Sequence, residues 1–244
     1  MSSLPSFFLA STAFHDLRVT LHDPDVIRQM RKVFRMQSGD TFIALDGAGH
    51  ECACVIDHID HTEVRAFIAE RKPNTRETAV PIMLYPSLIR RERFAVILEK
   101  CTELGVLAFV PVDATRSPYH DMSPNLRARW EHIIREAAEV ARRGLLPKLA
   151  PVASLADALT NIPEHEQVIA FSTAQENIKK ASDIVGIVKR ATRVHLFLGP
   201  EGDYTEEEYA LLQTRGALPL SLGARIVRSE TAAIAAVTLF TSLQ

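Results

Sequence analysis

The stretch Leu196-Phe-Leu-Gly-Pro-Glu-Gly-Asp-Tyr-Thr205 decides how the C-terminal half of this chain folds. Its apolar start predicts a β-strand over 194–198, and the glycines and proline of 199–202 then end that strand. Thr205 and Glu208 have the spacing of a helix capping box. We therefore expect a strand, a tight turn and a helix. Such a turn, at the carboxyl end of a strand, lets a flat ligand approach the backbone closely.

Two interpretations of this turn stay open on the residues alone. The turn is either purely structural or one wall of a binding pocket. A phosphate ligand is disfavoured, because 199–202 lacks the lysine and hydroxyl of a P-loop and the spacing of a dinucleotide fingerprint. Glu201 either faces the pocket and favours a cationic ligand, or complements the dipole at the start of the next helix.

A second unusual stretch, Leu222-Gly-Ala-Arg-Ile-Val-Arg-Ser-Glu-Thr231, follows shortly after. Arg225 and Arg228 alternate with apolar side chains in a pattern that fits neither a helix nor a strand. An irregular backbone with interleaved arginines indicates a bound partner. The alternative is an ion-pair network in which Glu230 or Glu201 neutralises an arginine.

The composition describes an ordinary globular protein. The 244 residues are 47% hydrophobic and 24% charged, which is enough for one large or two modest domains. We expect a cytoplasmic protein, since no apolar run reaches the length of a membrane span and the start lacks a basic signal region. Three cysteines make no disulfide framework. A net charge of -2 argues against coating nucleic acid by bulk charge, although a local basic patch stays possible.

The chain changes character after about residue 72. Residues 7–70 read as short strands with one helix at 25–36, which is typical of a small barrel. The polar run 70–78 is expected to be a linker. Strands and helices then alternate, including a helix expected at 181–188, and predict a mostly parallel sheet covered on both faces. We expect domains at 1–72 and 73–244, with ligands bound by loops at the carboxyl ends of the strands: 172–174, 199–204 and 222–229.

The segment Cys52-x-Cys54-x-x-x-His58-x-x-His61 contains four possible metal ligands in ten residues. A strand directs the first three side chains to one face at increasing distance, so they do not converge as zinc ligands do. We expect no metal.

The two stretches together resemble a known family. Leu-Gly-Pro-Glu-Gly at 198–202, followed by Leu-Gly-x-Arg-Ile-x-Arg-x-Glu-Thr-Ala at 222–232, is similar to the signature pair of the RsmE-type 16S ribosomal RNA uridine-N3 methyltransferases of the SPOUT superfamily. The run Glu99-Lys-Cys-Thr-Glu-Leu-Gly-Val106 and the segment Arg31-Lys-Val-Phe-Arg35 resemble further family motifs. Two positions depart from the pattern: the family usually has glycine at Asp203 and glutamine at Val140.

The resemblance implies an α/β fold in which a SPOUT trefoil-knot domain with a mostly parallel sheet follows a small PUA-like β-barrel. It implies a homodimer and S-adenosyl-L-methionine as cofactor. The positions that match the family's cofactor pocket are Phe171, Leu198, Gly199, Glu201, Gly202, Leu222, Gly223, Ile226 and Val227.

The implied reaction is methylation of N3 of a uridine in 16S ribosomal RNA of the small ribosomal subunit. The N3 proton must leave and the resulting anion must be held in place. Arg228 or Arg225 is expected to stabilise that anion, and Glu230 either accepts the proton or orients Arg228. The uridine must leave its stack, and a basic cluster is expected to hold the flanking phosphates: Arg28, Arg31, Lys32 and Arg35.

Two other functions stay open. One is a non-catalytic RNA-binding factor of ribosome assembly that has lost methylation. The other is a knotted methyltransferase that acts on another RNA. Binding of S-adenosylmethionine distinguishes an enzyme from the non-catalytic factor. Only the identity of the methylated product distinguishes the implied reaction from methylation of another RNA.

Overall fold

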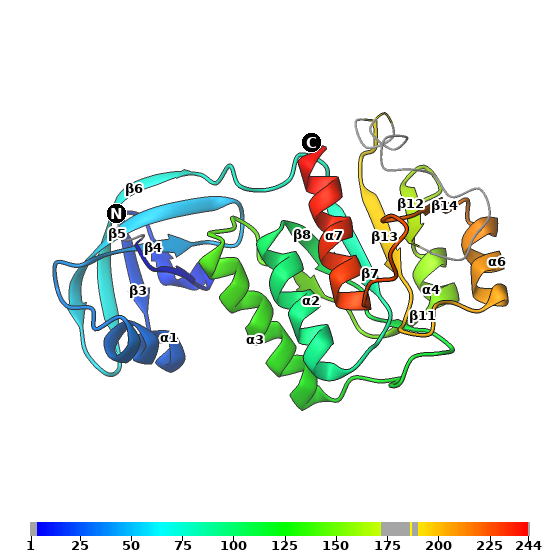
Figure 1. Cartoon of the computed structure of the whole chain (residues 1–244). Coiled ribbons are helices and arrows are strands. Elements are labelled where there is room, and N and C mark those ends of the chain that lie inside the picture. The colour runs from blue at the N-terminus through cyan, green and yellow to red at the C-terminus, as the bar shows by residue number, and fades with distance from the viewer. Residues whose placement is uncertain (1–3, 172–185, 187–189, 244) are drawn as a thin grey trace. The chain divides into compact units, whose positions relative to one another are not determined.

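The chain divides into two compact units. In the computed structural model, which describes residues 4–171, 186 and 190–243, unit 1 comprises Met1–Glu77 with Ala138–Leu146, and unit 2 comprises Thr78–Ala137 with Pro147–Gln244 (Figure 1). The segment 138–146 thus returns to the N-terminal unit after the second unit has begun. The expected domain limits of 1–72 and 73–244 stay a prediction.

Unit 1 is built on a curled, six-stranded sheet. Only β1 and β4 pair in parallel, and the other neighbours are antiparallel. In sheet order the strands are β1 (Ser6–Phe8), β4 (Thr41–Leu45), β5 (His50–Ile59), β6 (Val64–Pro73), β3 (Arg18–Leu21) and β2 (Phe14–His15). The turn between β4 and β5 needs its glycines, because Gly47 and Gly49 have φ of 68° and 97°.

The helical segment of unit 1 differs from the single helix expected at 25–36. A short helix α1 (Pro24–Arg28) is followed by a π-helical turn η2 (Gln29–Val33), and a 3₁₀ turn η1 (Ser11–Ala13) lies earlier in the chain. Asp23 caps α1 by accepting hydrogen bonds from the next turn's N–H groups. Met30 of η2 is fully buried in the core of the unit, so this turn contributes an apolar side chain to that core.

The expected linker at 70–78 is wrong in its first part. Residues 70–73 extend β6, where Arg71 pairs with Cys52 of β5 and Pro73 pairs with His50. The charged side chains of this extension find partners on the same surface: Lys72 Nζ lies 3.5 Å from Glu51 and Arg71 Nη2 lies 3.2 Å from Asp46. Backbone pairing therefore outweighs the absence of apolar residues.

The cysteines of β5 belong to the core of unit 1. Cys52 and Cys54 are both fully buried there, and burial raises the pKa of Cys54 to about 12. Such a thiol stays protonated, whereas metal ions bind the thiolate. His58 forms its contact with Asp60 instead, at 3.1 Å. Within the described residues no three His, Cys, Asp or Glu side chains lie together as a metal site would require.

Unit 2 contains a six-stranded parallel sheet. Its strands, in sheet order, are β10 (Lys148–Leu149), β8 (Val106–Phe109), β7 (Ile82–Pro86), β13 (Val194–Leu198), β12 (Gln167–Phe171) and β14 (Leu218–Leu220). A second, two-stranded parallel sheet joins β9 (Val112–Asp113) and β11 (Ala153–Ser154). The helices are α2 (Arg91–Glu103), α3 (Pro124–Val140, whose last residues belong to unit 1), α4 (Leu155–Thr160), α6 (Glu206–Thr214) and α7 (Ser229–Ser242).

Helices cover both faces of this sheet, as the alternation of strands and helices predicts. On one face Phe171 of β12 contacts Phe240 of α7 edge to face. On the other face Ala170 and Phe197 share a buried cluster with α4 and α6. Among the described helices none combines the length and the apolar character that crossing a membrane would need.

The helix boundaries follow their local signals. Ser123 accepts a hydrogen bond from the Leu126 N–H at the start of α3, and Gly105 ends α2 with a φ of 100°.

The expected helix at 181–188, apart from Gly186, and the expected loop at 172–174 lie outside the described residues. Val140 is 79% exposed at the end of α3, and nothing in the structure explains why it replaces the family's glutamine.

We predict that Arg143→Ala destabilises the protein by about 3 kcal/mol, because it removes a buried cation and leaves the partly buried Glu77 carboxylate without it. Arg143 is 2% exposed and donates to Glu77, which also accepts from the backbone N–H groups of Gly144 and Leu145. Thermal unfolding followed by circular dichroism measures the change. Arg129→Ala, on the exposed face of α3, is the matched control and should change stability by less than about 0.5 kcal/mol. Equal stability of the two variants would contradict the prediction.

Candidate functional site

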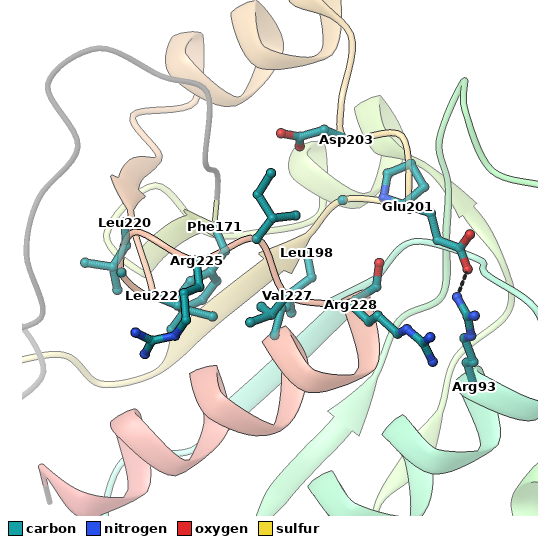
Figure 2. Close-up of a pocket in the computed structure, with 16 residues that line it drawn as sticks. Arg93, Phe171, Leu198, Glu201, Asp203, Leu220, Leu222, Arg225, Val227 and Arg228 are labelled. Atoms are coloured by element: carbon teal, nitrogen blue, oxygen red, sulfur yellow. Dashed lines mark hydrogen bonds and ion pairs between the residues drawn. The ribbon is translucent and has the colours of Figure 1, made fainter.

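A cavity of about 330 Å³ lies at one edge of the unit 2 sheet. Three neighbouring parallel strands end there: β12 at Phe171, β13 at Leu198 and β14 at Leu220. The loops that follow β13 and β14 form its walls (Figure 2). The lining residues are Arg93, Phe171, Leu198, Gly199, Pro200, Glu201, Asp203, Leu220, Leu222, Gly223, Arg225, Ile226, Val227, Arg228, Ser229 and Ala232. Most of these are apolar or contribute backbone, and the charged side chains are few, as in many small-molecule sites.

The first wall is a turn held by Asp203. The Asp203 N–H donates to the Pro200 carbonyl at 3.0 Å, which closes the turn, and Asp203 has a φ of 59°. Its Oδ1 accepts hydrogen bonds from the Tyr204 N–H at 2.8 Å and from the Tyr209 hydroxyl at 2.6 Å. Aspartate tolerates this left-handed conformation better than most residues do. Two hydrogen bonds to the Asp203 side chain thus stabilise a backbone conformation that glycine would adopt without strain.

The end of this turn is anchored to the loop after β9. Thr205 and Glu208 form the expected capping box at the start of α6. Glu208 is buried and also accepts a hydrogen bond from the Thr115 N–H at 2.8 Å. The neighbouring Arg116 donates to the Gly202 carbonyl at 2.7 Å. A β-carbon on Gly202 would lie 3.2 Å from Arg116 Cδ, so this close approach favours glycine.

The second wall is the irregular segment 222–228. Gly223 has a φ of 114°, and the residues from Gly223 to Arg228 are exposed. Ile226 is 90% exposed although it is apolar. In Figure 2 the side chains of Arg225 and Arg228 diverge, Arg225 lying beside Leu222 and Arg228 extending towards the end of the cavity that Arg93 borders. Helix α7 begins immediately afterwards, with the Ala232 N–H donating to the Arg228 carbonyl at 2.8 Å.

Arg93 joins the two walls. It lies in the first turn of α2, and its guanidinium pairs with Glu201 of the first wall (Figure 2). Its Nε also lies 3.8 Å from Glu230, at the start of α7. Glu201 is therefore engaged by a cation and does not offer a free negative charge to the cavity. In the sequence Arg93 appears only as one member of an arginine cluster, and no local spacing distinguishes it from Arg90 or Arg91.

The chain matches known families of RNA methyltransferase domains. The profile of the RNA methyltransferase domain matches residues 76–241, and the profile of the RNA methyltransferase PUA domain matches residues 25–68. The ribosomal RNA small subunit methyltransferase E of Bacillus subtilis (strain 168) is 30% identical over 218 residues, which cover 87% of this chain and 85% of that protein. The chain belongs to the ribosomal RNA small subunit methyltransferase E family.

Solved structures agree with membership of this methyltransferase E family. A ribosomal RNA small subunit methyltransferase E from Neisseria gonorrhoeae, bound to S-adenosyl methionine, is 27% identical and has a TM-score of 0.88, with 99% of this chain and 98% of that chain covered. A Legionella pneumophila protein in complex with the bound cofactor SAM is 26% identical, with a TM-score of 0.87 and 98% of both chains covered. The expected fold class is confirmed: a curled PUA-like sheet and a SPOUT α/β unit with a parallel sheet.

In the structure, most of the site residues predicted from the sequence lie together. Of the expected cofactor positions, eight line the cavity: Phe171, Leu198, Gly199, Glu201, Leu222, Gly223, Ile226 and Val227. Gly202 does not line it and packs against Arg116. Arg225 and Arg228 line the cavity, whereas Glu230 faces Arg93. Sequence reasoning missed Arg93, Asp203 as a turn former, and the α7 residues Ser229 and Ala232.

The predicted RNA-binding residues lie in unit 1. Arg31, Lys32 and Arg35 line a separate cleft of about 510 Å³, together with residues of β5 such as His58. Arg28 does not line this cleft and pairs with Asp25 at 2.8 Å. Phe34, between the basic residues, is 46% exposed. The cluster therefore combines cations with an accessible aromatic ring.

We predict that Asp203→Ala lowers the stability of this methyltransferase E family member by about 2 kcal/mol, because alanine loses both hydrogen bonds and is strained at positive φ. Asp203→Gly loses the same hydrogen bonds but not the conformational freedom, so it should cost about 1 kcal/mol less. Thermal unfolding of the two variants measures the difference. Equal or reversed stabilities would show that the left-handed backbone is not the main constraint on this turn.

Proposed function

We propose that this chain transfers the methyl group of S-adenosylmethionine to N3 of a uridine in 16S ribosomal RNA of the small ribosomal subunit. The observation that carries the proposal is the single cavity enclosed by the two signature loops at the carboxyl ends of β12, β13 and β14. The family membership of the chain and the S-adenosyl methionine bound in the Neisseria relative both support S-adenosylmethionine as the ligand. Such a modification belongs to ribosome biogenesis and takes place in the cytoplasm.

The residues of the cavity suit S-adenosylmethionine. Phe171, Leu198 and Val227 supply apolar surface for a flat adenine, and the exposed turn around Gly199 brings backbone groups close to it. When bound, the cofactor supplies a methyl group activated by a sulfonium.

The arginines of the second wall supply the electrostatics. A uracil that has lost its N3 proton carries negative charge on its oxygens, and a guanidinium within reach stabilises that charge. We assign this role to Arg228, with Arg225 as the alternative, because both line the cavity and neither forms an ion pair with another described residue. Glu230 is held by Arg93, so we assign it to positioning the start of α7 rather than to accepting the proton.

Unit 1 is assigned to RNA binding. The target uridine must leave its stack, and the nucleotides around it then need contacts from the protein. The cleft lined by Arg31, Lys32 and Arg35 offers cations for phosphates. We also propose a homodimer, because Ile226 is 90% exposed beside the cavity and an exposed apolar side chain at a functional site favours coverage by a partner.

The experiment that tests this function uses the full-length protein, S-adenosylmethionine, and either isolated small ribosomal subunits or naked 16S ribosomal RNA. Mass spectrometry of the nucleosides should detect 3-methyluridine in a protein-dependent manner. Binding of S-adenosylmethionine without any methylated nucleoside would contradict the proposed substrate. Absence of both binding and product would favour the non-catalytic assembly factor, and another methylated nucleoside would favour a different RNA target.

We predict that Arg228→Ala abolishes most methyl transfer, by about 100-fold, while S-adenosylmethionine affinity changes little, because the lost interaction forms only as the base becomes anionic. Single-turnover assays and calorimetry measure the two quantities. Arg228→Lys keeps the charge and should recover part of the rate. Full turnover in Arg228→Ala would overturn this assignment.

The double variant Arg31→Ala and Arg35→Ala should weaken RNA binding and reduce its salt dependence, because two phosphate contacts are lost. S-adenosylmethionine affinity should stay unchanged, since both residues lie in unit 1. Fluorescence anisotropy at several salt concentrations tests this, with Arg71→Ala as the control, because Arg71 is exposed and lies at the opposite end of the β5–β6 pairing from His58. Unchanged RNA affinity would remove the cluster from the RNA interface.

A further inference from the structure

Basic and aromatic side chains that belong to neither signature loop lie near the first wall of the cavity. Arg91 lies in the first turn of α2, two residues before Arg93, which lines the cavity. Its guanidinium carbon lies 5.2 Å from the centroid of the Tyr119 ring. Tyr119 follows β9 and is 38% exposed. Arg116, on the same segment, is also exposed. We refer to Arg91, Arg116 and Tyr119 together as the rim.

Contacts within unit 2 place the rim beside the first wall of the cavity. Arg116 donates to the carbonyls of Gly202, at 2.7 Å, and Tyr204, at 3.4 Å. The segment after β7 pairs in parallel with β9, with the Leu88 N–H donating to the Val112 carbonyl at 2.9 Å. The chain therefore leaves β7 and β9 in the same direction. The rim residues follow the carboxyl ends of these strands, just as the turn around Glu201 follows that of β13.

We propose that the rim is a contact surface for single-stranded RNA on the catalytic unit itself, which rests on the proposed function. Nucleotides beside an extruded base lose their stacking neighbour and keep their phosphates, so they bind surfaces that offer an aromatic ring together with cations. Tyr119 provides the ring, and the guanidinium of Arg91 extends the stacked surface. Arg116 is oriented by its two carbonyl contacts and adds a cation next to the turn.

Two carboxylates near the rim already have basic partners: Glu201 pairs with Arg93, and Asp113 lies 2.7 Å from His120. Glu206 lies with Arg116 along a neighbouring cleft, and the pKa of Glu207 is lowered by hydrogen bonds to that carboxyl and, to a smaller extent, by Arg116. These carboxylates oppose an approaching phosphate less than free ones would. In this arrangement the rim binds the nucleotides next to the target uridine, and the basic cleft of unit 1 binds other phosphates of the RNA.

The test measures binding of a fluorescent single-stranded oligouridylate to the full-length protein by anisotropy, at several salt concentrations. Tyr119→Ala should lower affinity about tenfold without changing the salt slope, because it removes a stacking contact and no charge. Tyr119→Phe keeps the ring and should retain affinity. Arg91→Ala should lower affinity and also reduce the slope of log affinity against log salt by about 0.7.

Arg190→Ala is the matched control, because it removes one exposed arginine just before β13, at the opposite end of that strand from the cavity. It should leave both affinity and slope unchanged. S-adenosylmethionine affinity should be unaffected in every rim variant. Unchanged RNA affinity in Tyr119→Ala and Arg91→Ala, or an equal loss in Arg190→Ala, would overturn the inference. A wild-type protein that binds RNA through the rim without methylating it would support the rim and contradict the proposed function.

Discussion

The parallel pairing of β12 with β13 and β14 is the constraint on which the site depends. The register aligns Phe171 with Leu198 on one side and with Leu220 on the other, so the three strands end at the same level. Parallel strands cannot be joined by tight hairpins, and each must be followed by a loop at this edge. Two loops that α6 and β14 separate in the sequence thereby become opposite walls of one cavity.

Ion pairs between distant elements then fix these walls. Arg93 of α2 contacts Glu201 after β13 and Glu230 at the start of α7, so one guanidinium ties together three segments. Glu208 performs a similar role on the other side of the turn, where it joins the helix cap to Thr115. The carboxylates of the site are therefore mostly engaged, and Arg225 and Arg228 are the charged groups of the second wall that line the cavity. This division between held and available charge underlies the proposed roles.

The sequence predicts the parts of this arrangement that depend on local signals. The strand, turn and capping box around Gly199 and Thr205 were all expected and occur, and the alternating pattern predicted the parallel sheet. Arg93 could not be found this way, because its partner Glu201 is 108 residues away. The role of Asp203 depends on the position of Tyr209 one helical turn into α6. The strand at 70–73 forms by pairing with β5. The amino-acid composition of 70–73 gives no sign that such a partner strand is available.

The most direct test of the central claim is a calorimetric titration of S-adenosylmethionine into the wild-type protein and into Ala232→Phe. Ala232 lines the cavity from α7, and a phenyl ring at this position would occupy the space between the two loops. We predict one binding site per wild-type chain, and loss of that binding in Ala232→Phe at an unchanged melting temperature. Equal affinity in the two proteins would contradict the account, because the cofactor would then bind outside this cavity.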